Sequence, residues 1–215
     1  PALHDIDIFL QPGQIVGLLG PNGSGKTTLI KILTGLLKDY SGVVKINGKA
    51  IGTETKAIVS YLPDEPYFSD WMKVKDALSI FMDMYADFDY AKCLEIMKKF
   101  QIEENVRIKT MSKGTKEKSQ LALVMSRKAK LIILDEPIGG VDPAAEVILD
   151  TILENYSPEQ TILIATHLIA DIERIFSNVI FIKKGKIVLN KEVEEIRQES
   201  NKSIDELFRE EFRYE

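Results

Sequence analysis

The stretch Ile15-Val16-Gly17-Leu18-Leu19-Gly20-Pro21-Asn22-Gly23-Ser24-Gly25-Lys26-Thr27 decides the fold of this chain. Its first five residues form an apolar run that predicts a buried strand, and the other eight match the phosphate-loop pattern G-x-x-x-x-G-K-[ST]. Glycines let successive backbone N–H groups converge on one concavity, and a helix beginning near Lys26 adds its positive end. The stretch therefore predicts a cradle for a triphosphate. A glycine-rich turn without a ligand is the alternative interpretation.

The side chains of this loop suit a nucleotide that carries a Mg²⁺ ion. We expect Lys26 to reach the β- and γ-phosphates and the Thr27 hydroxyl to hold Mg²⁺. The Thr28 hydroxyl is expected near the α-phosphate. The predicted nucleotide-binding residues are Gly20, Pro21, Asn22, Gly23, Ser24, Gly25, Lys26, Thr27 and Thr28.

The composition sets limits on the class of protein. The chain has 215 residues, a net charge of −5 and a single cysteine, Cys93, so it forms no internal disulfide and fits a reducing compartment. Its apolar stretches are far shorter than the roughly 20 residues that span a bilayer, and we expect no secretory leader. The acidic total argues against wholesale binding of nucleic acid, although a local basic face remains compatible with it.

The hydrophobic pattern changes along the chain. Residues 1–63 alternate strand-like runs with turns, residues 64–130 show helical periodicity, residues 131–190 alternate buried strands with helices, and residues 191–215 form a charged helical tail. This order predicts α/β architecture with a mainly parallel sheet. Helical spacing of Phe81, Met84, Tyr85 and Phe88 predicts a stripe that faces the core. The predicted strands are Ile6–Ile8, Ile15–Leu19, Val43–Ile46, Ala57–Leu62, Leu131–Leu134, Thr161–Ala165 and Val179–Ile182, with hairpin turns at Asn47-Gly48 and Lys184-Gly185-Lys186.

Two carboxylates follow the apolar run Leu131–Leu134. The carboxyl end of a parallel strand is where a nucleotide site needs them. We expect Asp135 to bind Mg²⁺, directly or through water, and Glu136 to orient an attacking water or accept its proton. A strand that ends in a solvated acidic turn is the simpler alternative, and the phosphate loop upstream argues against it.

These motifs together resemble the ATP-binding subunit of a bacterial ABC transporter. The resemblance rests on Gly20–Thr28, on Asp135-Glu136-Pro137, on Gly140-Val141-Asp142-Pro143 and on Thr166-His167, which occur in the family's order over nearly the whole chain. It implies a phosphate-loop ABC ATPase fold in one domain, 1–215. In that fold, residues 1–63 and 131–190 form the nucleotide-binding core with an antiparallel β subdomain. Residues 64–130 form an inserted helical subdomain and residues 191–215 a C-terminal tail.

The family's signature loop corresponds to Met111–Thr115, which reads Met-Ser-Lys-Gly-Thr where relatives usually have Leu-Ser-Gly-Gly-Gln. The resemblance implies that Ser112 and Gly114 contact the γ-phosphate of an ATP held by a second subunit. Ser112 is also a plausible N-cap for the following helix, and the two roles are compatible. Lys113 replaces a glycine, so it either strengthens the phosphate contact in trans or points to solvent.

In the family, two such domains pack head to tail, as a homodimer or a heterodimer, and enclose two ATP molecules. Asp142 would then line the dimer seam, although an Asp-Pro turn that begins a helix explains it equally well. The resemblance implies that His167 hydrogen-bonds the γ-phosphate and holds the geometry of the catalytic water. A purely structural histidine is the alternative.

The main departure from the family lies in Tyr61–Pro66, where Asp64 takes the place of the usual glutamine. We expect Asp64 to serve Mg²⁺, directly or through water, while adding negative charge near the γ-phosphate. Glu65 would substitute for it in another loop register, and a turn punctuated by two prolines is the structural alternative. We also expect the aromatic that relatives stack on adenine to be missing, because the segment Leu3–Leu10 begins almost at the first residue.

The implied partner is a separate transmembrane permease subunit, which would hold the chain on the cytoplasmic face of the membrane. Two explanations are open for the apolar group Tyr67, Phe68, Trp71 and Met72, namely contact with that permease and packing inside the helical subdomain. The implied cofactors are ATP and Mg²⁺, and the implied activity is ATP hydrolysis that powers transport.

A soluble ABC-type ATPase that acts in translation or DNA repair is the alternative function. A basic cluster would suit it, but a solvated helix face explains that cluster more simply, and we expect no nucleic-acid partner. A small-molecule kinase is disfavoured, because it leaves Ser112, Glu136 and His167 without roles. The cluster comprises Lys113, Lys116, Lys118, Arg127, Lys128 and Lys130.

Overall fold

A six-stranded sheet forms the centre of the computed structural model, which describes residues 2–66, 68–138 and 144–213. The strand order is β4-β5-β6-β1-β7-β8, and all neighbours are parallel except β7 and β8. The expectations for Tyr67 and Asp142 lie outside the described residues. The strands of this sheet are β1 (Ile15–Leu19), β4 (Val59–Leu62), β5 (Leu131–Asp135), β6 (Thr161–Thr166), β7 (Asn178–Lys183) and β8 (Lys186–Glu192).

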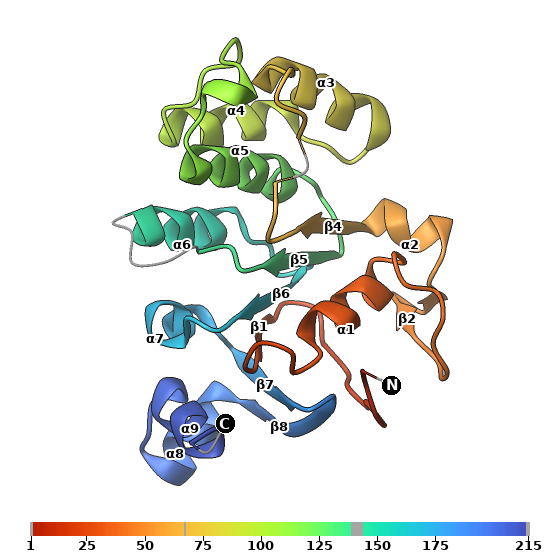
Figure 1. The fold of residues 1–215 in the computed structure, drawn as a ribbon, viewed down its shortest axis with the longest axis vertical. Coiled ribbons are helices and arrows are strands. Elements are labelled where there is room, and N and C mark those ends of the chain that lie inside the picture. Colours follow the sequence, from red (N-terminus) through yellow and green to blue (C-terminus); the bar gives the residue numbers. More distant parts are fainter. Residues whose placement is uncertain (1, 67, 139–143, 214–215) are drawn as a thin grey trace.

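Helices cover both faces and both ends of the sheet (Figure 1). α6 and α7 lie on one face and α1 on the other, α3, α4 and α5 form a layer above β4, and α8 and α9 lie at the β8 end. The helices are α1 (Lys26–Leu33), α2 (Thr53–Ile58), α3 (Val74–Met84), α4 (Tyr90–Lys99), α5 (Lys113–Met125), α6 (Ala144–Asn155), α7 (Ile169–Ile172), α8 (Val193–Ser200) and α9 (Ile204–Glu211). Two 3₁₀ turns are η1 (Ile108–Thr110) and η2 (Glu173–Ile175), and a hairpin of β2 (Lys45–Ile46) and β3 (Lys49–Ala50) completes the elements.

Successive side chains along each strand point to opposite faces of the sheet, so the apolar residues form two cores, one on each face. In β1, Ile15 and Leu19 join the core under α6 and α7, whereas Val16 and Leu18 join the core under α1. No helix among residues 2–66, 68–138 and 144–213 is long and apolar enough to cross a bilayer.

Both predicted hairpins are confirmed, because β2 pairs with β3 around Asn47-Gly48 and β7 pairs with β8 around Lys184-Gly185. The strand predicted at Ile6–Ile8 is wrong: these residues are irregular, and Ile6 and Ile8 pack against the core under α1 without joining a strand. The strand predicted over Val43–Ile46 shortens to β2. Within the described residues, neither Ile6–Ile8 nor Val43-Val44 pairs with a neighbouring strand.

Two further predictions need correction. Ala57 and Ile58 end α2 rather than beginning a strand, because the Gly52 N–H donates to Thr55 Oγ1 at 2.9 Å and starts a helix there. The prediction that the stripe through Phe81 faces the core is wrong at Met84, because this side chain, at the end of α3, is 66% exposed. Two later members of that stripe still reach the core from the connection after α3, because their rings lie 5.3 Å (Tyr85) and 5.6 Å (Phe88) from the Phe81 ring.

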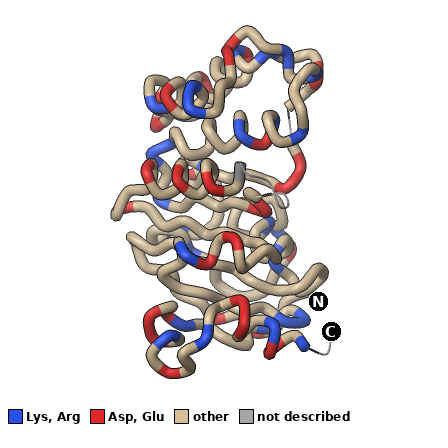
Figure 2. The backbone as a smooth tube through the Cα atoms, turned by 90° about the vertical axis from the view of Figure 1, so that its left-hand side faces the viewer, with Lys and Arg blue, Asp and Glu red and all other residues tan. Residues whose placement is uncertain are grey.

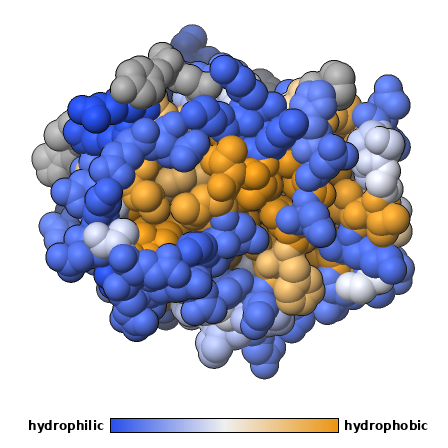
Figure 3. Space-filling model, turned by 90° about the horizontal axis from the view of Figure 1, so that it is seen from below, coloured by the Kyte–Doolittle hydropathy of each residue, from blue (hydrophilic) through white to orange (hydrophobic). Residues whose placement is uncertain are grey.

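The edge strand β8 and the N-terminal segment lie at the lower end of the molecule. Figure 3 views this end from below and shows apolar side chains gathered in its middle between hydrophilic ones. Val188 on β8 is 44% exposed there.

Candidate active site

Four predicted site segments meet at one edge of the sheet. β4, β5, β6 and β1 are adjacent and parallel, and their registers pair Leu62 with Leu134, Asp135 with Ala165, and Leu19 with Thr166. The carboxyl ends of parallel strands share an edge, so the segments that follow these strands leave the sheet side by side. The fold thereby brings together the loop containing Asp64, the carboxylates after β5, His167 and the phosphate loop.

The lysine side chain of the phosphate loop is buried and hydrogen-bonded to the backbone of its own loop. Lys26 is buried, and its Nζ donates to the carbonyl oxygens of Gly20 at 2.6 Å and Pro21 at 3.2 Å. Burial lowers the pKa of the Lys26 ammonium, and the negative charges of Glu136 and Asp135 oppose that shift. The ammonium is therefore held by the loop and lies close enough to the carboxylates that follow β5 to be influenced by their charge.

The N-terminus of α1 is open to an anion. Gly25 precedes α1 with a left-handed φ of 116°, and no side chain of the described residues caps the first N–H groups of the helix. A Cβ on Gly25 would lie 2.8 Å from Leu3 Cδ2, the end of a flexible side chain, so the left-handed φ is the stronger reason for glycine at this position. The buried Ser24 hydroxyl has no hydrogen-bond partner among the described residues, although the Gly185 N–H donates to the Ser24 carbonyl at 2.8 Å. These features fit a bound phosphate chain.

Asp135 is a buried carboxylate that lacks full charge compensation. It is 5% exposed at the end of β5, and its pKa is raised to about 6 by burial and then by the charges of Glu136 and Asp64, against the opposing effect of Lys26. A carboxylate in this state favours a cation beside it. The same negative charge, after burial itself, raises the pKa of the neighbouring Tyr61 to about 12.

Glu136 and His167 are in direct contact. Glu136 Oε1 lies 2.8 Å from His167 Nδ1, while Glu136 Oε2 accepts hydrogen bonds from Thr166 Oγ1 at 2.9 Å and from the His167 N–H at 3.4 Å. The Glu136 backbone has a left-handed φ of 48°, which is uncommon for a residue with a side chain and is frequent at functional sites. Three contacts therefore fix one carboxylate at the edge where the phosphate loop lies.

Thr166 was not among the predicted site residues. Its position at the end of β6, directly before His167, is the sequence signal that places it on this edge. Its hydroxyl both donates to Glu136 and accepts from the Leu168 N–H at 3.0 Å. Thr166 therefore connects Glu136 to the start of α7.

The predicted Mg²⁺ ligands fit an ion that is shared with phosphate. Asp64 and Thr27 are exposed while Asp135 is buried, and no group of three His, Cys, Asp or Glu residues in the described part of the chain could hold a metal by itself. Mg²⁺ commonly binds through one or two carboxylates, water and substrate phosphates. Asp135 and the Thr27 hydroxyl are suited to that arrangement, whereas a site made of protein ligands alone is not present in these ranges.

The signature residues lie apart from these strand ends, on α5. Ser112 is exposed and caps α5, accepting the Thr115 N–H at 3.1 Å, which confirms the predicted capping role. Lys113 is exposed and pairs with Glu117 at 3.6 Å. Within the described ranges, the hydrogen bonds and ion pairs of these two residues stay inside their own helix, so Ser112 and Gly114 present an open helix end.

The apolar group near Trp71 divides between surface and core. Trp71 is 75% exposed, whereas Met72 is buried and Phe68 is half-buried against the core. A groove of about 360 Å³ lies beside Phe68 and is also lined by Pro66, Asp70, Met111, Lys113 and Lys116.

The predicted basic cluster is not a free cationic face. Figure 2 shows blue and red segments interspersed through the helical layer of α3, α4 and α5. Arg127 is buried, so it is not part of a solvated helix face at all. Acidic partners accompany most of the cluster, in the pairs Lys113–Glu117, Lys116–Asp70, Arg127–Asp87, Lys128–Asp89 and Lys130–Glu159.

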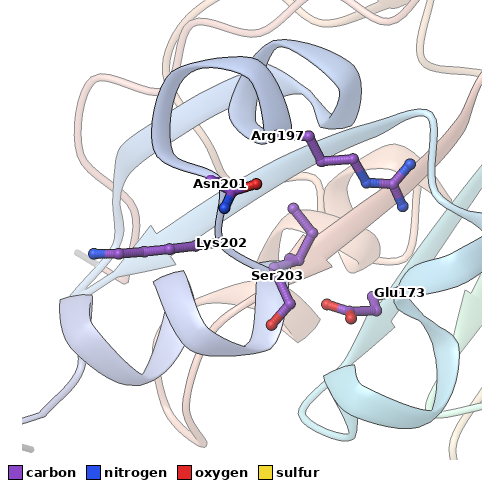
Figure 4. A pocket seen from close by; sticks show the side chains of 6 residues that line it. Glu173, Arg197, Asn201, Lys202 and Ser203 are labelled. Carbon is purple, nitrogen blue, oxygen red and sulfur yellow. The ribbon is translucent and has the colours of Figure 1, made fainter.

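A second pocket, of about 280 Å³, lies away from the strand ends (Figure 4). Two of its charged groups are engaged by the protein, since Glu173 Oε2 accepts the Asp205 N–H at 2.9 Å and Lys202 Nζ contacts Glu210 at 2.7 Å. It is lined by Glu173, Arg197, Asn201, Lys202, Ser203 and Ile204. These contacts give no sign of a ligand.

Comparison with known proteins agrees with this geometry. Residues 3–139 match the family model described as ABC transporter. The ABC transporter ATP-binding protein YdbJ of Bacillus subtilis is 36% identical over 216 residues, which cover 95% of this chain and 69% of YdbJ.

Solved structures show the same fold. A structure described as the ATP binding subunit of an ABC transporter superposes with a TM-score of 0.87 and 27% identity, covering 97% of this chain and 92% of that one. The ATP-binding cassette MJ0796, solved as a dimer in a post-hydrolysis state with ADP and Pi, has a TM-score of 0.77 and 20% identity, covering 89% of this chain and 90% of its own. The second likeness concerns the fold alone.

Proposed function

The chain belongs to the ABC transporter family, and on this premise we propose that two copies enclose ATP between the phosphate loop of one and Ser112 and Gly114 of the other. The chain is an ATP-binding subunit whose ATP hydrolysis powers transport. One observation carries the proposal. The phosphate loop, Asp135, Glu136 and His167 share one sheet edge, while Ser112 stands on a separate helix end.

Within one copy, the residues at the sheet edge have separate roles. Lys26 and the N–H groups at the start of α1 bind the phosphates, and Thr28 adds a hydroxyl. Glu136 orients the attacking water and accepts its proton, because its carboxylate is fixed at this edge. His167 holds Glu136 and contacts the γ-phosphate.

Mg²⁺ would be held by Thr27 and Asp135, with Asp64 acting through water. When bound, such an ion neutralises charge that develops on phosphate oxygens. The raised pKa of Asp135 supports this assignment, since a nearby cation would relieve the repulsion from Glu136 and Asp64.

The second copy supplies the charge contacts that a single copy lacks. The exposed end of α5 offers the Ser112 hydroxyl, the Lys113 ammonium and the N–H groups of its first turn, all of which suit a γ-phosphate. The dimer of MJ0796 with ADP and Pi supports a paired state of this fold. Asp142 is assigned to the seam of the dimer. Homodimers and heterodimers are both compatible with this arrangement.

We further assign the chain to the cytoplasmic face of a membrane, bound to a separate permease subunit. The exposed Trp71, which follows the groove residue Asp70 in the sequence, supports a docking role for this region. The proposed organisation is a nucleotide-binding core, residues 1–63 and 131–190, with a helical subdomain, residues 64–130, and a tail, residues 191–215. The acidic partners of the basic cluster give no support to nucleic-acid binding.

The variant Glu136→Gln tests the proposal. It should bind MgATP, fail to turn it over and sediment as a dimer with ATP, while the unmodified chain hydrolyses ATP. Glu95→Gln, at an exposed position on α4, is the matched control and should behave as the unmodified chain. A Glu136→Gln protein that stays monomeric at saturating MgATP, or that hydrolyses it normally, contradicts the proposal.

A further inference from the structure

Arg127 is a long, charged side chain that is almost completely buried. It follows the C-terminal end of α5, and its side chain is only 1% exposed. A buried guanidinium is stable only when its N–H groups are satisfied, so its partners show which parts of the fold it connects.

Those partners come from two different layers of the molecule. Toward the helical layer, Nε donates to Asp87 Oδ1 at 2.9 Å and Nη2 donates to Asp87 Oδ2 at 3.1 Å. The guanidinium carbon also lies 3.7 Å from the centroid of the Tyr85 ring. Asp87 and Tyr85 both belong to the connection between α3 and α4.

Toward the sheet, the same guanidinium donates to two backbone carbonyls. Nη1 contacts Val59 O at 2.6 Å, and Nη2 contacts Ala57 O at 2.5 Å. Ala57 lies in the last turn of α2, where carbonyl groups lack helical partners and a cation is favourable, and Val59 begins β4. One planar group thus joins the α3–α4 connection to the strand that precedes Asp64.

We propose that Arg127 is a positioning residue that fixes the orientation of α5, and with it Ser112, relative to the sheet. This inference rests on the proposed function, because orientation matters only if Ser112 must meet an ATP held by another copy. Arg127 touches no substrate, and its effect passes through α5.

The geometry of α5 explains why this fixation matters. The helix has 13 residues, so it is about 20 Å long, with Arg127 beyond one end and Ser112 at the other. A tilt of about 10° at Arg127 would move Ser112 by about 3.5 Å, more than the length of a hydrogen bond. A helix that is free to tilt would present its signature end to the partner in the correct place for only part of the time.

The test uses the Glu136→Gln protein as parent and measures the dissociation constant of its MgATP-bound dimer by sedimentation. Arg127→Met should raise this constant about tenfold or more, and Asp87→Asn should raise it less, because the two carbonyl contacts remain. Arg127→Lys should fall between parent and Arg127→Met, since an ammonium keeps the charge but cannot reach both layers. Arg107→Met removes an exposed arginine from the same layer and should match the parent.

Two readouts separate positioning from damage to the fold. The affinity of each monomer for MgADP, measured by calorimetry, should equal that of the parent. In the background with Glu136 intact, hydrolysis by Arg127→Met should fall at low protein concentration and recover as the concentration rises, because mass action restores the dimer. A loss that protein concentration does not reverse, or one matched by lost MgADP affinity, overturns the inference.

The outcomes also distinguish this inference from the proposed function. If the parent forms no MgATP dimer, the proposed function fails. If the parent dimerises and both Arg127→Met and Asp87→Asn dimerise equally well, only the inference fails. Where Arg127→Met shows no cooperative unfolding transition, Asp87→Asn and Arg127→Lys decide the result by the same two readouts.

Discussion

Glu136 Oε1 lies 2.8 Å from His167 Nδ1, and the two residues directly follow the adjacent parallel strands β5 and β6. This contact, together with the hydrogen bond from Thr166, fixes the carboxylate that we assign to the attacking water. The relationship leads to the first prediction. His167→Ala should lower the turnover of ATP by about 100-fold, because proton transfer depends on a positioned base, while ATP affinity changes little. Steady-state hydrolysis and calorimetric titration measure the two quantities.

The other histidine provides the control for that experiment. His4 lies outside the site, and its backbone N–H donates to the Gly185 carbonyl at 2.8 Å. His4→Ala should therefore keep normal turnover. Equal losses in both variants would remove His167 from its assigned role.

Asp135→Asn should stabilise the protein without nucleotide at neutral pH. Asp135 has a folded-state pKa of about 6, above its ordinary value of 3.8, so the folded protein resists its ionisation. The stability associated with the protonated form is present below about pH 4 and is lost as the pH rises through 6. The free energy of unfolding of Asp135→Asn should exceed that of the unmodified chain by up to about 3 kcal/mol at pH 8, and by progressively less below pH 6.

Urea unfolding at pH 5 and pH 8 measures this difference, with Asp83→Asn at an exposed position of α3 as control. The same Asp135→Asn protein should lose the extra thermal stability that MgATP gives the unmodified chain. A gain that is independent of pH argues against burial and charge repulsion as its cause.

Asp64→Gln should strengthen the binding of MgATP or speed its turnover by about three- to tenfold. Asp64 is one of the charges that raise the pKa of Asp135, so its removal makes the site less repulsive to phosphate. The adjacent Glu65→Gln is the matched control and also tests the other register of the loop. Unchanged affinity and turnover in Asp64→Gln would show that this charge has no influence on the site.

Ser112 combines two roles that substitution can separate. Ser112→Ala removes the cap of α5 and should cost about 1 kcal/mol of stability as well as activity. Ser112→Asp keeps a capping oxygen but directs a negative charge toward the γ-phosphate, so it should keep its stability and lose its activity. Thermal unfolding and ATP hydrolysis, measured on both variants, check this separation. Full activity in Ser112→Asp would leave only the capping role.

Much of the site edge could be predicted from the sequence, because its segments are local. The strand, loop and helix around Lys26 lie within twenty residues, and the carboxylates directly follow an apolar strand. The sequence could not predict that β1 pairs with β6 and β7, since strand order depends on contacts more than 140 residues apart. The contact between Glu136 and His167 depends on that order.

Arg127 shows why side-chain environment was harder to predict. Lys128 and Lys130 follow it in the sequence, and this suggested a solvated face. Arg127 is nevertheless buried, because Asp87, forty residues earlier, and two backbone carbonyls satisfy its N–H groups. Local patterns do not contain such long-range pairs. The boundary of α2 was missed for a different, local reason: a hydrogen bond from the Gly52 N–H to Thr55 Oγ1 starts a helix in a segment whose apolar residues had indicated a strand.

The central claim, that each ATP site is completed by a second copy, is tested most directly by mixing two inactive variants. Lys26→Ala lacks the phosphate contact, and Ser112→Asp lacks the contact in trans, so each should be inactive alone. In a mixed dimer, one site combines the intact loop of the second variant with the intact Ser112 of the first. We predict that hydrolysis in an equimolar mixture returns to about a quarter of the normal rate, because about half of the dimers are mixed and each has one intact site. A mixture as inactive as its components would contradict the account.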